Sequence, residues 1–235
     1  MGPIRRTVAL GCALLFPAAL RAQAPGLAPG ATSLAPARDS FDVLVQGRSI
    51  GFSRREVRAV PGGFLYVEET QIGEFVRQRT EIALGHDGLV RQVQQGGVVQ
   101  GVSIRASLAY RGGRVRGVTV APSGGAAVTF TVDTAVAPDV VDDNAIPLYL
   151  PTLGWGTDTL WRFTAFVSGE NAFRPMTLAV IGADTLTVPA GRFDVWLAEL
   201  RGGQVPVRFF VNKTPPHRVV REEIIGTPLT FVLVR

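Results

Sequence analysis

The two histidines are the first side chains in this sequence that could bind a metal or transfer a proton. His86 lies in Gly85-His86-Asp87-Gly88, which is typical of a hairpin turn, and His217 follows Thr214-Pro215-Pro216 at the start of a predicted strand. A metal site needs three or four protein ligands that converge on one point, and the spacing of these histidines provides no such set. The sequence therefore predicts no metal centre.

Acidic residues suggest two further kinds of site. The run Asp139-Val140-Val141-Asp142-Asp143 lacks the alternating ligands, central Gly and terminal Glu of a calcium loop, and helix capping by its last aspartates explains it equally well. Glu68-Glu69 and Glu222-Glu223 are neighbours on predicted strands, so the members of each pair point to opposite faces and cannot act on one substrate. Glu199 shares the parity of nearby apolar residues, and we expect it to form an ion pair.

No nucleophile or cofactor motif is present in the sequence. Cys12 is the only cysteine and lies in a segment that we expect to be removed, which leaves no thiol, disulfide or cysteine-bound metal. A nucleophile elbow, a phosphate-binding loop and a dinucleotide fingerprint are all absent from the sequence. We therefore expect no enzymatic activity and no cofactor.

Residues 1–24 have the three parts of a signal peptide. Arg5 and Arg6 precede an apolar run over residues 8–20, and Ala22-Gln23-Ala24 provides small residues at the spacing that signal peptidase recognises. The apolar run is shorter than the roughly 20 residues that a spanning helix needs. We predict cleavage after residue 22 or 24, export to the periplasm or the extracellular space, and no integral membrane segment after cleavage.

Composition divides the rest of the chain into a linker and one domain. Residues 25–38 are rich in Pro, Ala and Gly without periodicity, which predicts a flexible linker before a single domain over residues 39–235. The formal charge of +5 falls to +2 when Arg5, Arg6 and Arg21 leave with the signal peptide. The remaining arginines are interspersed with acidic residues, whereas a nucleic-acid-binding surface carries one sign of charge. We therefore expect no nucleic-acid partner.

From Phe41 onward, apolar residues recur with a period of two, which predicts strands with one buried face. In the clearest run, over residues 101–111, the residues on the apolar face are Val102, Ile104, Ala106, Leu108 and Tyr110. A further apolar face is predicted from Val205 to Val211. The pattern thus predicts a protein made mainly of half-buried strands.

Glycine-containing segments between the apolar runs predict hairpin turns. Gly96-Gly97, Gly202-Gly203 and Gly182-Ala183-Asp184 are examples. Short turns between successive strands imply an antiparallel meander, because parallel strands need long crossovers. The expected fold class is all-β, a curved sheet, open barrel or sandwich of about fourteen strands.

One segment departs from the strand pattern and predicts the single short helix. Asp142-Asp143-Asn144 precedes an apolar stretch over residues 145–153, and Pro147 falls near its first turn. Acidic residues and an early proline are helix-initiation signals. We expect this helix to pack over an end or an edge of the sheet.

Three short motifs carry a resemblance to a known family. They are a G-x-x-x-G at residues 47–51, a V-x-A-G-x-F within residues 187–196, and a strand that ends near a Pro-Arg pair at residues 214–221. With these motifs the chain resembles the exported bacterial proteins called Domain of Unknown Function 3108, over most of residues 39–235. The resemblance implies an all-β fold similar to lipocalins or lipoprotein carriers, and it implies no catalytic residues.

Two functions from different classes are compatible with this sequence. The first is a periplasmic carrier or binder of an apolar, lipid-like small molecule. We expect its ligand-binding concavity to be lined by aromatic residues, namely Tyr110, Trp161, Phe163, Trp196 and Phe209. The second is a structural or assembly factor of the cell envelope, whose sheet face or edge docks another envelope protein. A pocket in the interior favours the first function, and a filled interior with an exposed apolar patch favours the second.

Overall fold

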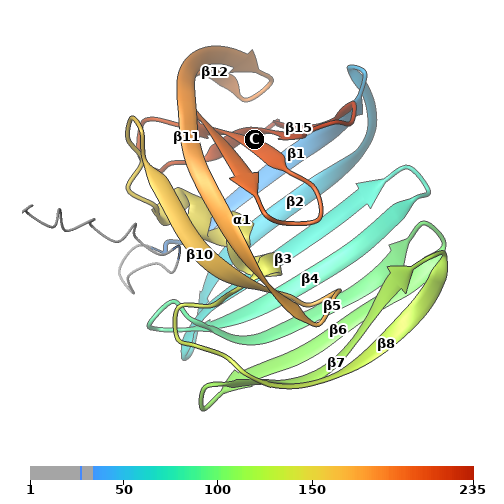
Figure 1. Ribbon diagram of the computed structural model, residues 1–235. Coiled ribbons are helices and arrows are strands. Elements are labelled where there is room, and N and C mark those ends of the chain that lie inside the picture. The colour runs from blue at the N-terminus through green and yellow to red at the C-terminus, as the bar shows by residue number, and fades with distance from the viewer. Residues whose placement is uncertain (1–26, 28–33) are drawn as a thin grey trace, which may run out of the picture.

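Alternating apolar and polar side chains fold into one continuous, strongly curved sheet in the computed structural model (Figure 1), which describes Leu27 and residues 34–235. This part of the chain contains fifteen strands in a single sheet, close to the predicted fourteen. The predicted signal peptide, residues 1–24, lies outside the described residues, as does most of the predicted linker. The expectation of an antiparallel all-β fold is confirmed.

The first eight strands form a meander from the middle of the sheet to one of its ends. Their bounds are β1 Ala37–Val45, β2 Arg48–Val60, β3 Gly63–Ile72, β4 Val76–Gly85, β5 Val90–Val99, β6 Val102–Arg111, β7 Arg114–Ser123 and β8 Ala126–Ala135. The remaining strands run from the other end back to the middle. They are β9 Val141–Asp142, β10 Leu160–Val167, β11 Ala172–Val188, β12 Gly191–Arg201, β13 Val207–Asn212, β14 Val219–Ile224 and β15 Leu229–Leu233.

The strand order requires the sheet to curl. β1 pairs with β15 in register Phe41↔Leu233, so the two halves of the chain join at the centre, while β8 and β9 are the two ends of the sheet. The five residues 136–140 connect these ends and can span only about 20 Å. The ends must therefore approach each other, and we call their junction the seam. Across it, a Cβ built on Gly169 would lie 3.6 Å from the Cβ of Ala121 on β7.

A short helical segment closes one end of the curved sheet. It comprises η1 Asp143–Ala145, α1 Ile146–Tyr149 and η2 Leu150–Thr152, and Asp142 caps it by accepting a hydrogen bond from Asn144 N at 3.0 Å. Its apolar side chains are buried, and the Tyr149 hydroxyl donates to the carbonyl of Gly88 in the β4–β5 turn at 3.2 Å. The prediction of one short helix is confirmed.

Within Leu27 and residues 34–235, no helix combines the length and the hydropathy that a membrane-spanning segment requires.

Two of the predicted turns are wrong. Gly96-Gly97 lies inside β5, where a Cβ on Gly97 would come within 2.0 Å of Arg77 O on β4. This glycine therefore permits a close approach of two strands, and the hairpin turn is at Gln100-Gly101, with φ of 52° and 79°. Residues 182–184 lie inside β11, at a shift of register opposite β12 that bends the strand and extends it to seventeen residues.

Two predicted boundaries also differ from the structure. β1 begins at Ala37, two residues before the predicted domain start, and Leu27 within the predicted linker is fully buried in the core. Val205 is not part of a strand and is 49% exposed, because β13 begins only at Val207. Both differences come from tertiary contacts, which cannot be inferred from the alternation of apolar and polar residues along the chain.

Candidate functional site

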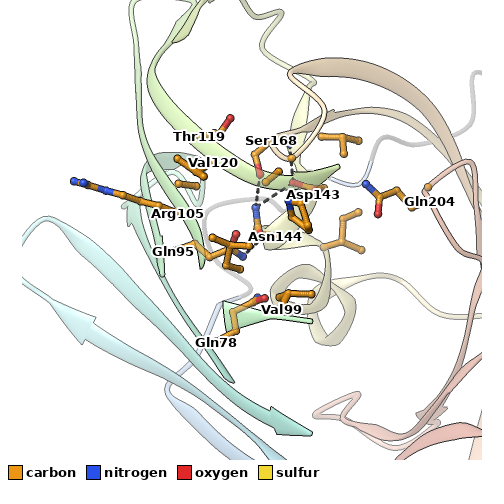
Figure 2. Close-up of a pocket in the computed structure, with 18 of the residues that line it drawn as sticks. Gln78, Gln95, Val99, Arg105, Thr119, Val120, Asp143, Asn144, Ser168 and Gln204 are labelled. Carbon is orange, nitrogen blue, oxygen red and sulfur yellow. Dashed lines mark hydrogen bonds between the residues drawn. The ribbon is translucent and has the colours of Figure 1, made fainter. Parts of the chain in front are cut away.

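A pocket of about 400 Å³ lies at the seam, on the concave side of the sheet. β4 to β7 form one wall, and η1, the β10–β11 turn, β11 and β12 form the other (Figure 2). The pocket thus joins residues that are far apart in the chain, such as Gln78 and Leu200. Only the curl of the sheet brings these walls together.

Asn144 is the centre of the polar part of the pocket. Its Oδ1 accepts a hydrogen bond from Gln95 Nε2 at 2.9 Å, and its Nδ2 donates to Ser168 Oγ at 3.2 Å and to Asp143 Oδ1 at 3.1 Å. These residues belong to β5, η1 and the β10–β11 turn, and Figure 2 shows them converging. The amide of Asn144 therefore holds the two sides of the seam together.

Asp142 lies beneath this network and is almost completely buried, with 1% of its surface exposed. Its Oδ2 accepts a hydrogen bond from the Tyr110 hydroxyl, and its Oδ1 accepts from Asn144 N at 3.0 Å and from Asn144 Nδ2 at 2.9 Å. Burial raises the pKa of Asp142, and these hydrogen bonds oppose the rise. Burial, and next the charge of Asp142, raises the pKa of Tyr110.

Asp143 lines the pocket itself. Its Oδ1 accepts from Asn144 Nδ2 and from the backbone N–H of Ser168 at 3.4 Å. Burial, and next the negative charge of Asp142, raises the pKa of Asp143 to about 8. A pKa of this value favours the protonated form of the Asp143 carboxyl at neutral pH.

No basic side chain neutralises this pair within the part of the chain that the structure describes, since every ion pair there involves other acids. Arg105 borders the pocket through its backbone, but its side chain is exposed and Figure 2 shows it pointing away from Asp143 and Asn144. The two acids thus have no counter-ion within the described chain, and an ionised carboxylate without one is costly in a protein interior.

Thr119 on β7 is a second unsatisfied group on the pocket wall. It is 1% exposed, and its Oγ1 has no hydrogen-bond partner among residues 27 and 34–235. A buried hydroxyl without a partner costs about 1–3 kcal/mol, and such groups are rare in native proteins. Because this oxygen is enclosed by surrounding atoms, a ligand in the open pocket cannot contact it.

Much of the remaining lining is apolar, and Gln78 and Gln204 also border the pocket. Its buried apolar side chains include Ile104, Ile146, Val167, Met176 and Leu200. The site therefore has one face that hydrogen-bonds and one face that excludes water, which suits a molecule with a polar head and a short apolar body.

The five aromatic residues predicted to bind a ligand do not line this pocket. Trp161, Phe163 and Phe209 are 3%, 8% and 3% exposed and belong to the core, where Trp161 contacts Trp155 edge-on with ring centroids 5.0 Å apart. Tyr110 supports Asp142. The half-buried ring of Trp196 lies 4.5 Å from Lys213 Nζ. The structure thus assigns packing contacts to these residues, and their role in ligand binding stays a prediction.

Sequence reasoning missed the polar residues of the pocket. Asp142 was predicted as a helix cap, and it is one, but its role in supporting the polar wall was missed. The sequence signal that could have identified them is the alternation along each strand. Gln95 and Thr119 occupy inward-facing positions of strands whose other inward residues are apolar. A polar residue at a core position needs a partner or a function.

The other candidate residues have structural partners. Glu199 pairs with Arg208 at 2.7 Å and with Arg201, so the predicted ion pair is confirmed. His217 Nδ1 lies 3.0 Å from Asn212 O, and His86 is in the β4–β5 turn. In the described ranges, no three His, Cys, Asp or Glu side chains are grouped so that they could hold a metal ion.

A second buried polar cluster connects β2 and β3 with β14. Arg55 Nε donates to Glu68 Oε1 at 2.9 Å, and Arg55 Nη2 donates to Glu222 Oε2 at 3.1 Å. The hydroxyls of Tyr66 and Ser53 also donate to Glu68, at 2.9 Å and 3.0 Å. Because both carboxylates are paired with Arg55, we interpret this cluster as a structural ion-pair network that links these strands.

A family model described as "Protein of unknown function (DUF3108)" matches residues 99–234, which is more than half of the chain. The chain belongs to this family. The sequence resemblance is thereby confirmed, and the DUF3108 match covers most of the pocket, including Thr119, Asp143, Asn144 and Ser168. No match was found among curated proteins.

Two solved structures are similar to this DUF3108 chain. One is a beta-barrel-like protein of Domain of Unknown Function DUF1849 from Brucella abortus, with 13% identity, a TM-score of 0.49, and coverage of 86% of this chain and 97% of that chain. The other is a protein with a YmcC-like fold from Bacteroides fragilis, with 11% identity, a TM-score of 0.28, and coverage of 84% and 93%.

Proposed function

We propose that this protein is an exported, non-enzymatic binder or carrier of a small amphiphilic molecule, which it holds in the pocket at the seam. The observation that carries the proposal is an open pocket of about 400 Å³ in which the hydrogen-bonding wall of Asp143 and Asn144 lies beside buried apolar side chains. A few convergent polar groups in a mostly apolar concavity are the usual arrangement of a small-molecule site.

The size and lining of the pocket support this function. Its volume falls within the range of about 300–1,000 Å³ that small-molecule sites occupy, towards the lower end. Asp143, Asn144 and Ser168 would orient the polar end of the ligand, and the apolar wall around Ile104 and Leu200 would cover its body. The ligand is therefore lipid-like but short.

The proposal of export rests on the N-terminal sequence. Arg5 and Arg6, the apolar run over residues 8–20 and the small residues at 22–24 have the order of a cleaved signal peptide. An extracytoplasmic binder of amphiphiles would meet its ligand among the components of the cell envelope.

The test is binding of an environment-sensitive alkyl probe to matched variants on β6. Ala106 is buried on the pocket wall, whereas Ala109 on the same strand is exposed. Ala106→Phe should abolish saturable probe fluorescence, and Ala109→Phe should leave it unchanged. Absence of saturable binding to the parent would refute the proposal.

A second candidate function is supported by the free edge of β8. Within residues 34–235, β8 pairs only with β7, so its other edge presents unpaired backbone groups, and the strand contains no Lys or Pro to protect it. A partner could add a strand there. This function becomes the better account if the pocket binds no probe.

A further inference from the structure

We infer that the ligand of this pocket carries a protonated amine, and that Asp143 receives that amine while the apolar wall covers an alkyl or aryl body. This inference rests on the proposed function, since it names the chemical class of the ligand for the same pocket. It follows from the charge of the polar wall and from the acceptor atoms that the wall leaves free.

The charge of the pocket excludes an anionic head group. Asp142 and Asp143 are adjacent, both are desolvated, and no arginine, lysine or histidine among the described residues pairs with either. A carboxylate or phosphate in this pocket would meet two acidic side chains and no compensating cation. An ammonium group would instead supply the counter-ion that the pair lacks.

The free acceptors also match an ammonium group. Both oxygens of Asp142 are occupied by Tyr110 and Asn144, and Asp143 Oδ1 is occupied by Asn144 and Ser168. Asp143 Oδ2 accepts no hydrogen bond within the described chain, so it is the carboxyl oxygen of this pair that remains free on the pocket. An ammonium has three donors and no acceptor, so it needs oxygens of this kind.

The binding step includes the release of a proton. Burial, and next the charge of Asp142, raises the pKa of Asp143 to about 8, so at pH 7 the neutral carboxyl gives up its proton to solvent when the ammonium binds. The products are a carboxylate–ammonium pair and one proton in solution. The titratable groups nearest to Asp143 are Asp142 on β9, Tyr110 on β6 and Tyr149 on α1, and both tyrosines remain neutral because burial raises their pKa.

Three eight-carbon amphiphiles test the inference, namely octylamine, octanol and octanoate. Isothermal titration at pH 7 should give octylamine about tenfold tighter binding than octanol, with octanoate weakest. Repeating the octylamine titration in buffers of different ionisation enthalpy should reveal the release of up to one proton. Asp143→Asn should reduce octylamine affinity to that of octanol, leave octanol within about threefold, and abolish proton release. Asp139→Asn makes the same substitution at an exposed position and should change nothing.

The negative results distinguish a failure of this inference from a failure of the proposed function. If no amphiphile binds, the proposed function fails together with this inference. If octanol or octanoate binds as tightly as octylamine, or if Asp143→Asn keeps the preference for the amine, the inference fails and the proposed function stands. Should Asp143→Asn not fold, the parent protein alone decides, because the preference for octylamine over octanol and the release of a proton must both be observed, and the absence of either contradicts the inference.

Discussion

The hydroxyl of Tyr110 on β6 donates a hydrogen bond to the buried carboxylate of Asp142 on β9, although these strands lie near opposite ends of the sheet. The bond crosses the seam and fixes the residue that caps the helical segment. Asp142 in turn accepts a hydrogen bond from Asn144 Nδ2. The polar wall of the pocket therefore depends on the hydrogen bond between Tyr110 and Asp142, which lies behind that wall. The same contact opposes the rise that burial causes in the pKa of Asp142.

Tyr110→Phe should destabilise the protein by about 1.5–3 kcal/mol, because it removes a hydrogen bond to a charged group. Tyr149→Phe is the matched control, since the Tyr149 hydroxyl donates to a neutral carbonyl, that of Gly88, and its loss should cost about 0.5–1.5 kcal/mol. Urea unfolding measures both free energies. An effect of Tyr110→Phe no larger than that of Tyr149→Phe would show that Asp142 is not ionised in the folded state.

The stability of the protein should fall between pH 5 and pH 8. The folded chain keeps the proton of Asp143 up to about pH 8, whereas the unfolded chain releases it near pH 4. Folded protein therefore binds more protons in this window, and raising the pH favours unfolding. The stabilising contribution is complete below pH 4 and is lost by about pH 8. The raised pKa of Asp142 acts in the same direction.

Asp143→Asn should flatten this pH dependence by up to roughly 1.4 kcal/mol per pH unit, the value for one proton. Carboxylates whose pKa is lowered, such as Glu68 and Glu199, change stability only below about pH 5 and do not obscure the window. Chemical unfolding at pH 5, 6, 7 and 8 gives the slope. An unchanged slope in the variant would assign the effect to another group.

The ion pair inside the sheet should be intolerant of losing its arginine. Arg55→Met leaves Glu68 and Glu222 without their cation in a poorly solvated position, which should cost about 3–5 kcal/mol. Arg54→Met is the control, because Arg54 is exposed and contacts only the ring of Phe52 at 4.3 Å, and should cost less than about 1 kcal/mol. Equal losses in guanidinium unfolding would contradict a buried role for Arg55.

Trp161 tests whether the aromatic core is filled. Trp161→Ala should cost about 3–5 kcal/mol, because the ring is 3% exposed and packs against Trp155. Phe75→Ala, at a residue that is 69% exposed, should stay within about 0.5 kcal/mol. A loss below about 1 kcal/mol at Trp161 would mean that this ring borders an unfilled space, as the sequence-based ligand hypothesis requires.

The repeating parts of this fold could be predicted from local pattern alone. The alternation from Val102 to Tyr110 predicted both β6 and its buried face, and the acidic residues before Pro147 predicted the helical segment. Each of these features depends on neighbouring residues, so a short window of sequence is sufficient. Gly96-Gly97 was misinterpreted because Gly97 permits a close approach to β4, which only the paired strand reveals.

The pocket could not be predicted in the same way. Gln95, Thr119, Asn144 and Ser168 come from four separate elements, and they meet only because the two ends of the sheet curl together. The pairing of β1 with β15 is equally non-local. What the sequence contained was weaker evidence, namely polar residues at inward-facing positions, and this evidence becomes specific only when the opposite wall is known.

The most direct test of the central claim is an amide NMR titration of the folded protein with octylamine. The account predicts saturable shifts at the backbone amides of Thr119, Asn144, Ser168 and Gly169, which surround the pocket, and no shift at Gly62 in the β2–β3 turn. Saturable shifts clustered elsewhere, for example around the exposed Phe75, with those four amides unmoved, would contradict the assignment of this pocket as the binding site.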